Sequence, residues 1–196
     1  HPLHTAYMLA EIKADMPTIA AGLLHDVPED TGHGLGEIKE KFGPEIAHLV
    51  KGITKLGKIK YRGIERYREN LKRMFLAMAS DLRVIFIKFC DRLNNLRTLD
   101  SLPPEKQKRI AQETLEIYVP IAGMLGIARL KWQMEDICFK YLYPEQFHDL
   151  EYKYEVEKKV ERNRFFQKVK DILTPKLKEA GLTYTIEVRF KHLYSI

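Results

Sequence analysis

Hydrophobic residues recur at helical spacing through most of the chain. Between residues 64 and 79 the apolar positions lie three or four residues apart: Leu71, Met74, Phe75 and Met78. This spacing places apolar side chains on one face of an α-helix. It recurs, more loosely in the first two cases, over residues 7–16, 17–26, 35–42, 45–52, 105–125 and 128–142. The pattern therefore predicts an all-α fold for most of the chain.

The stretch 81–98 differs from the others because it is apolar around most of its circumference. A helix of this kind is surrounded by other helices, so we expect it at the centre of the fold. Ser80 and Asp81 are suitable caps for its start. Pro120 falls inside the predicted helix 105–125, where a proline removes a backbone hydrogen bond and bends the helix.

The character of the sequence changes at three points. Residues 51–62 are rich in lysine and contain glycine, which predicts a basic loop. From 151 to 170 charges of both signs replace most apolar positions, as in a long solvated helix that joins two domains. Polar and apolar residues alternate over 183–188, which predicts a β-strand. We therefore divide the chain into a helical domain (1–150), linker helices (151–180) and the start of a second domain (181–196).

Composition narrows the class of protein. The chain has 196 residues, of which 45% are hydrophobic and 31% charged, and these values exclude a fibrous or disordered protein. The longest apolar runs, such as 84–87, are too short to span a bilayer, so we expect no membrane partner. Cys90 and Cys138 are too few for a disulfide scaffold, and the cytoplasm is the expected location. The net charge of +6 favours anionic partners.

Four ionisable side chains stand at the end of the apolar helix 17–26 and just beyond it: His25, Asp26, Glu29 and Asp30. On a helix, residues four apart are neighbours, which pairs His25 with Glu29 and Asp26 with Asp30. Burying such groups costs free energy unless they are paired or bind a metal. They also fit a helix end that reaches water, although acidic groups there oppose the helix dipole.

The predicted central helix carries a second polar group. Asp91, Asn95 and Thr98 lie at positions i, i+4 and i+7, so they form one polar stripe on an otherwise apolar helix. A buried aspartate needs a cation or several hydrogen-bond donors. A salt bridge from Asp91 to Arg92 or Arg97 is the alternative, but neither arginine faces the stripe. The stripe therefore favours a functional site.

Together the two polar stretches offer both nitrogen and oxygen ligands. His25, Asp26 and the distant Asp91 suit Mn²⁺, Fe²⁺ or Zn²⁺, with His1 as the candidate fourth ligand. The other histidines fit solvated positions or lack an acidic partner at ligand spacing, and they include His4, His33, His48 and His148. The residues alone therefore indicate a metal-dependent phosphohydrolase without naming its substrate.

A nucleic-acid-binding module is the rival class. The predicted basic loop contains Lys51, Lys55, Lys58, Lys60 and Arg62. These cations suit the phosphates of a nucleic acid or of a nucleotide equally well. Tyr61 is the one aromatic residue of the loop, which makes it a poor platform for stacked bases. We therefore expect no direct nucleic-acid binding by this chain.

At these residues the sequence resembles the RelA/SpoT family of bifunctional stringent-response enzymes over nearly its whole length. The matching motifs are His-Pro at 1–2, Ala-Ala-Gly-Leu-Leu-His-Asp at 20–26, Glu-Asp-Thr at 29–31, Val-Lys-Gly-Ile-Thr-Lys-Leu at 50–56, Asp-Arg-Leu-Asn-Asn-Leu-Arg-Thr-Leu at 91–99 and Leu-Gly-Ile at 125–127. The resemblance implies an all-helical HD-type phosphohydrolase. Such enzymes remove the 3′-pyrophosphate from the alarmones ppGpp and pppGpp, which leaves GDP or GTP.

The resemblance also implies a role for each site residue. A Mn²⁺ ion would be held by His1, His25, Asp26 and Asp91. The attacking water would be oriented and deprotonated by Glu29 and Asp30. The guanine nucleotide alarmone would be contacted by Asn95, Thr98, Arg92 and Lys88. Two alternatives stay open: binding of alarmone without cleavage, which the intact Glu29–Asp30 pair argues against, and hydrolysis of another nucleotide.

Residues 188–196 resemble the opening of the family's α/β synthetase domain, of which this chain would hold only the first strand. Phe190 stands where the family motif usually has proline, and Asn94 where many members have histidine. Pro28 and Gly123–Met124 are further departures, and the segment that carries guanine-binding residues in the family would precede His1. We expect a fragment of a bifunctional protein that cannot itself make alarmone. Full-length family members associate with the ribosome.

Overall fold

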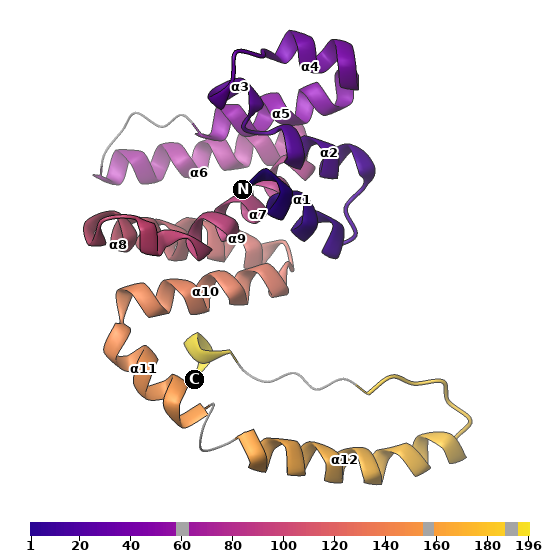
Figure 1. Cartoon of the computed structure of the whole chain (residues 1–196). Helices are drawn as coiled ribbons and strands as arrows, with labels where there is room; N and C mark the ends of the chain where they lie inside the picture. The colour runs from indigo at the N-terminus through magenta and orange to yellow at the C-terminus, as the bar shows by residue number, and fades with distance from the viewer. Residues whose placement is uncertain (58–62, 155–158, 187–191) are drawn as a thin grey trace. The chain divides into compact units, whose positions relative to one another are not determined.

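The computed structural model describes residues 1–57, 63–154, 159–186 and 192–196. Within these residues the regular structure is helical and no strand is present, which confirms the predicted all-α fold (Figure 1). The chain forms two compact units, His1–Cys138 and Phe139–Ile196. No helix among the described residues combines the length and the apolar character that crossing a membrane requires.

The first unit contains most of the helices. In chain order they are α1 (Pro2–Glu11), α2 (Met16–Leu24), α3 (Val27–Asp30), α4 (Leu35–Phe42), α5 (Pro44–Gly57), α6 (Gly63–Ser80), α7 (Arg83–Arg97), the 3₁₀ turn η1 (Leu99–Ser101), α8 (Pro104–Glu113), the π-helical η2 (Thr114–Tyr118), α9 (Val119–Met124) and most of α10 (Ala128–Leu142). The helices predicted over 35–42, 64–79, 81–98 and 128–142 are confirmed.

Helix α7 is the central helix, as its apolar circumference predicted. Ile85, Ile87 and Phe89 on it are completely buried. Four helices pack around it, namely α1, α2, α5 and α6. Asp91 sits in the middle of this helix, so the core itself fixes the position of a buried carboxylate.

Helices α1 and α2 pack closely because Gly22 has no side chain. A Cβ atom at Gly22 would lie 2.5 Å from Cδ1 of Leu9, which is closer than real Cβ contacts come. Asp15 caps the start of α2 by accepting a hydrogen bond from the backbone N–H of Thr18. This packing brings the end of α2 beside the start of α1, where the two histidine rings of His1 and His25 meet.

The prediction of a basic loop over residues 51–62 is wrong for the first half of that segment. Helix α5 continues to Gly57, so Lys51 and Lys55 lie on a helix. Tertiary packing explains the difference: Val50, Ile53 and Leu56 of α5 are buried at helical spacing. That burial outweighs the helix propensity lost at a single interior glycine, about 1 kcal/mol. Residues 58–62 of the predicted loop lie outside the described residues.

The predicted bend at Pro120 takes the form of a π-helical turn. The five residues of η2 end just before Pro120, which falls in the first turn of α9. A proline ring clashes with the carbonyl four residues earlier, and a wider turn relieves that clash. The bend therefore has a local cause, and it places Tyr118 against the central helix, edge-to-face with Phe89.

The second unit holds the end of α10, α11 (Pro144–Tyr152), α12 (Lys159–Glu179) and the 3₁₀ turn η4 (Leu193–Ser195). The ring of Phe139 contacts the rings of Tyr143, Phe147 and Tyr194. The compact units divide at Cys138, earlier than the boundary that we drew after residue 150, and the three-part division of the chain stays a prediction.

The predicted strand 183–188 is wrong for its described part, because residues 183–186 form no regular element. A strand needs another strand to satisfy its backbone groups, and no partner strand is present among the described residues. Helix α12 ends in a Schellman turn, in which the N–H of Leu182 donates to the carbonyl of Leu177 and Gly181 has a φ of +68°.

A charged cluster at the start of α7 gives a pH-dependent prediction. Arg83 donates to Asp81 at 2.8 Å, to Glu45 at 2.6 Å and to Asp15 at 2.8 Å, so it joins three segments. The hydrogen bond from Arg83 to Asp81 holds the pKa of Asp81 below its usual value. A carboxylate with a lowered pKa stabilises the fold above its unfolded pKa, and this contribution disappears as the pH falls. Asp81→Asn should therefore cost roughly 1 kcal/mol at neutral pH and progressively less below about pH 4, measured by urea denaturation.

Candidate metal centre

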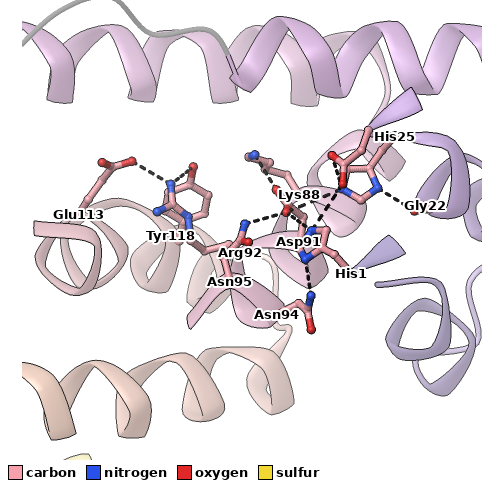
Figure 2. Close-up of polar contacts among 11 residues, drawn as sticks. His1, Gly22, His25, Lys88, Asp91, Arg92, Asn94, Asn95, Glu113 and Tyr118 are labelled. Atoms are coloured by element: carbon pink, nitrogen blue, oxygen red, sulfur yellow. Dashed lines mark hydrogen bonds and ion pairs between the residues drawn. The ribbon is translucent and has the colours of Figure 1, made fainter. Parts of the chain in front are cut away.

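Three side chains from separate elements converge beside the central helix (Figure 2). His1 precedes α1, His25 follows α2 and Asp91 belongs to α7. One potential ligand atom from each lies within 4.8 Å of the other two. Nε2 of His1 is 2.9 Å from Oδ1 of Asp91, and Nε2 of His25 is 3.8 Å from the same oxygen. Residues that are far apart in the sequence thus form one compact cluster, as their types predicted.

The tautomer of His25 leaves a lone pair directed into this cluster. Its Nδ1 lies 2.7 Å from the carbonyl of Gly22, so Nδ1 carries the proton and donates it. Nε2 is buried and has no hydrogen-bond partner among the described residues. Histidines that bind metals characteristically donate their other ring N–H to a carbonyl or a carboxylate. The orphaned Nε2 therefore fits a metal ligand better than a histidine satisfied within the core.

Asp26 lies at the edge of the same cluster. Its Oδ1 is 3.1 Å from Nε2 of His25, and its Oδ2 is 3.9 Å from Nε2 of His1. Burial is the main reason that the pKa of Asp26 is raised, and the charges of Asp91 and Asp30 add to the rise against the opposing charge of His25. Two crowded carboxylates favour a bound cation, because a cation relieves their mutual repulsion.

The same carboxylates affect the pKa of His25. Burial alone would lower the pKa of this histidine, but the neighbouring Asp91, the Gly22 carbonyl and Asp26 outweigh burial and raise it. The raised pKa means that the cluster attracts positive charge at Nε2. A proton or a metal ion can supply that charge, and metal binding requires the deprotonated ring.

Asp91 is the anionic centre of the cluster. Lys88 donates to its Oδ2 at 2.6 Å, and Asn95 donates to its Oδ1 at 2.8 Å. Burial would raise the pKa of Asp91, but the charge of Lys88 and the nearby His25 hold it well below its usual value. The carboxylate therefore stays ionised despite being buried. Lys88 makes this contact with Asp91, and its predicted contact with substrate stays a prediction.

Asn94 is a site residue whose role the sequence did not reveal. Its side-chain amide is hydrogen-bonded to Nδ1 of His1, so it sets the orientation of that ring. The amide nitrogen donates to Nδ1, so Nε2 of His1 carries the ring proton here and donates it to Oδ1 of Asp91 at 2.9 Å. A metal bound at Nε2 would take the place of that proton, and the amide would then turn its oxygen to accept from Nδ1. The sequence marked Asn94 only as a departure from histidine, because the partner is 93 positions away.

Arg92 does not join the cluster. Its guanidinium donates to Glu113 at 2.8 Å and to the hydroxyl of Tyr118 at 2.7 Å, and it stacks on the Tyr118 ring at 4.1 Å (Figure 2). The side chains of Arg92 and Glu113 are only 14% and 10% exposed. The structure therefore gives Arg92 a packing role between α7 and η2, and its contact with substrate stays a prediction.

Removing this buried pair should destabilise the fold strongly. Arg92→Ala leaves Glu113 buried without its cation, which typically costs about 3–5 kcal/mol of unfolding free energy. The matched control is Arg129→Ala, because the Arg129–Glu11 pair is exposed and worth under about 1 kcal/mol. Urea denaturation of both variants measures the difference. If Arg92→Ala were as mild as the control and only weakened substrate binding, the packing role would be refuted and the predicted contact of Arg92 with substrate supported.

The predicted acid–base pair lies beside the cluster on a separate helical turn. Helix α2 ends at Leu24, and Pro28 stands in the first turn of α3, so the predicted break in the helix at this proline is confirmed. Glu29 and Asp30 are exposed, and their backbone N–H groups donate to the Asp26 carbonyl at 3.0 Å and 2.9 Å. Their catalytic roles stay a prediction.

Asn95 and Thr98 follow Asp91 along α7 and are exposed. The hydroxyl of Thr98 donates to the carbonyl of Asn95 at 3.2 Å at the end of the helix. Its oxygen retains lone pairs for a further partner. The predicted polar stripe therefore exists, and its substrate contacts stay a prediction.

The first unit is all-helical and brings together two imidazoles and up to two carboxylates. This combination of fold and side chains indicates the class of protein. Residues 1–128 match the family model described as "HD domain", and the chain belongs to this family. The candidate metal cluster of His1, His25 and Asp91 lies within the matched residues, so it fits that assignment.

The names of similar proteins are more specific than the description of the family model. Over its whole length it is 47% identical to the "Probable guanosine-3′,5′-bis(diphosphate) 3′-pyrophosphohydrolase" of Synechocystis sp. and 45% identical to the "Bifunctional (p)ppGpp synthase/hydrolase SpoT" of Escherichia coli. It covers 26% and 28% of those proteins, so it spans about a quarter of the curated relatives it matches. The predicted resemblance to SpoT-type enzymes is confirmed.

A solved structure allows the fold of the chain to be compared with that of a known protein. The chain is similar to a metazoan ortholog of SpoT that hydrolyses ppGpp and plays a role in starvation responses, with a TM-score of 0.56 and 26% identity. The similarity covers 70% of this chain and 77% of the other.

Proposed function

We propose that this chain is the hydrolase part of a SpoT-type enzyme and removes the 3′-pyrophosphate from ppGpp and pppGpp. The observation that carries the proposal is the buried Nε2 of His25, which makes no hydrogen bond among the described residues and lies 3.1 Å and 3.8 Å from carboxylate oxygens of Asp26 and Asp91. The relatives supply the substrate, since two of them are named for this reaction. The cytoplasm remains the proposed location, in keeping with two buried free thiols.

The proposed metal is Mn²⁺, held by His1, His25, Asp26 and Asp91. A mixed set of imidazole and carboxylate ligands suits this ion, although Fe²⁺ and Zn²⁺ share the preference. A divalent cation at this position polarises a phosphate oxygen and lowers the pKa of water. Lys88 balances part of the negative charge of Asp91 and fixes its orientation.

The remaining residues act on the substrate and on water. Glu29 and Asp30 orient the attacking water and take its proton, because they lie beside the ligands without belonging to them. Asn95, one turn beyond Asp91 on α7, and Thr98, which follows the end of α7, contact the ribose and phosphates of the alarmone. Attack of water on the 3′-linked phosphorus breaks its bond to the ribose oxygen, and the ribose oxygen recovers a proton.

One assay tests the proposal directly. The purified chain is incubated with ppGpp and added Mn²⁺, and the products are separated by anion-exchange chromatography. The expected products are GDP and pyrophosphate in equal amounts, with GDP itself unchanged because it lacks the 3′-pyrophosphate. Tight binding of ppGpp without turnover would replace the proposal with an alarmone-binding domain. Turnover of another nucleotide but not of ppGpp would replace the substrate.

A further inference from the structure

A pocket of about 800 Å³ opens between α5, α6 and the first turn of α7. It lies apart from the candidate metal centre, since none of the metal-cluster residues is among the described residues that line it. Helices α5 and α6 pack side by side here (Figure 1). A volume of this size falls within the range of small-molecule sites.

Close packing of α5 on α7 forms the floor of this pocket. A Cβ atom at Gly52 would lie 2.7 Å from Cγ2 of Val84, so a side chain at this position would push the two helices apart. Val84 and Leu56 are buried, and they make the floor apolar. The depth of the pocket therefore depends on one glycine in the middle of a helix.

Lysines form the rim. Lys51 and Lys55 are one helical turn apart on α5, and Lys72 faces them across the pocket from α6. All three are exposed. Among the described residues, none of the ion pairs involves any of the three. Three lysines thus line one concave space, in which the carboxylate is that of Glu69.

The acidic side chain of the pocket is already compensated. Glu69 accepts a hydrogen bond from Nε of Arg73 at 2.9 Å, and this contact lowers the pKa of Glu69. Arg73 also donates to the backbone carbonyl of Lys55 at 3.2 Å, which ties α6 to the end of α5. Arg73 therefore fixes the spacing of the two walls and neutralises Glu69, so the charge of the three lysines prevails.

We propose that this pocket is a second anion site, which binds a compact polyphosphate such as inorganic pyrophosphate or the diphosphate of a nucleotide. Three lysines around a concave, partly apolar space can share the several charges of such a group. A nucleic acid fits less well, because the described lining residues include no Phe, Tyr or Trp side chain on which bases could stack. The site goes beyond the proposed hydrolysis and does not depend on it.

The test uses inorganic pyrophosphate as the probe and isothermal titration calorimetry of the whole chain in a chelating buffer. The pocket variant is Lys51→Ala/Lys55→Ala/Lys72→Ala. The matched control is Lys39→Ala/Lys41→Ala/Lys106→Ala, which removes the same charge from exposed lysines on α4 and α8. We expect the pocket variant to bind about tenfold more weakly or worse, and the control and Asp91→Asn to bind pyrophosphate like the parent.

Several outcomes would overturn the site. They are no binding by the parent chain, equal weakening in both lysine variants, or loss of binding in Asp91→Asn, which would move the anion to the metal centre. A parallel titration with GDP distinguishes the two sources of the anion, since tighter binding than pyrophosphate identifies a nucleotide and equal binding a free polyphosphate. Lysine-dependent binding of a single-stranded RNA without binding of pyrophosphate would replace the small anion with nucleic acid. Chelation stops metal-dependent turnover, so this result stands whether or not the chain hydrolyses ppGpp.

Discussion

Replacing Asp91 with asparagine is expected to abolish both metal binding and turnover of ppGpp. Asp91 contributes the most buried carboxylate of the cluster, and its charge is what holds Lys88, His1 and His25 around it. Asparagine keeps the size of the side chain but offers a neutral oxygen, so the affinity for a divalent cation should fall by about 100-fold or more. Calorimetric titration with Mn²⁺ and the ppGpp assay measure the two effects.

The choice of variants separates the loss of metal from the loss of fold. Asp91→Ala would leave Lys88 buried without a counter-charge, at a cost of about 3–5 kcal/mol, whereas Asp91→Asn retains a hydrogen-bond acceptor for it. Asp149→Asn, on an exposed carboxylate of α11, is the control and should bind Mn²⁺ like the parent. Full activity of the parent chain after exhaustive chelation would refute the metal role of all four proposed ligands together.

The sequence could predict the residues of the cluster because the signals are local. Asp91, Asn95 and Thr98 share one face of an apolar helix, and such a stripe is readable from the period of the helix alone. His25 and Asp26 stand where an apolar helix ends. Burial of polar groups in these places costs free energy, so their presence is informative without any knowledge of the fold.

Contacts that depend on tertiary structure were not predictable in this way. Arg92 follows Asp91 in the sequence. The direction of its side chain is set by Glu113 of α8 and Tyr118 of η2, which come later in the chain. Asn94 orients His1 across 93 positions. Lys51 and Lys55 were assigned to a loop because their segment is basic and contains glycine, a poor helix former, whereas the buried face of α5 decides the outcome.

The other large effect is expected at the acid–base pair, where Glu29→Gln and Asp30→Asn should each leave the metal bound and slow turnover by about 10²–10⁴-fold. Both side chains are exposed on α3, on a separate turn from His25, so their loss should leave the cluster intact. The charge of Asp30 contributes to the raised pKa of Asp26, so Asp30 lies within electrostatic reach of the cluster.

The measurement that decides the roles of the pair compares metal affinity with rate in the same samples. Glu37→Gln on the neighbouring α4 is the matched control, because it removes one exposed carboxylate that is paired with His33 and should leave both quantities unchanged. A catalytic pair predicts normal Mn²⁺ affinity with a reduced kcat. Near-normal kcat in both variants would show that Pro28 merely ends a helix before two solvated carboxylates, and the source of the base would then have to lie elsewhere. A larger loss for Asp30→Asn than for Glu29→Gln would assign proton transfer to Asp30 and orientation of the water to Glu29, because orientation tolerates an amide and proton transfer does not.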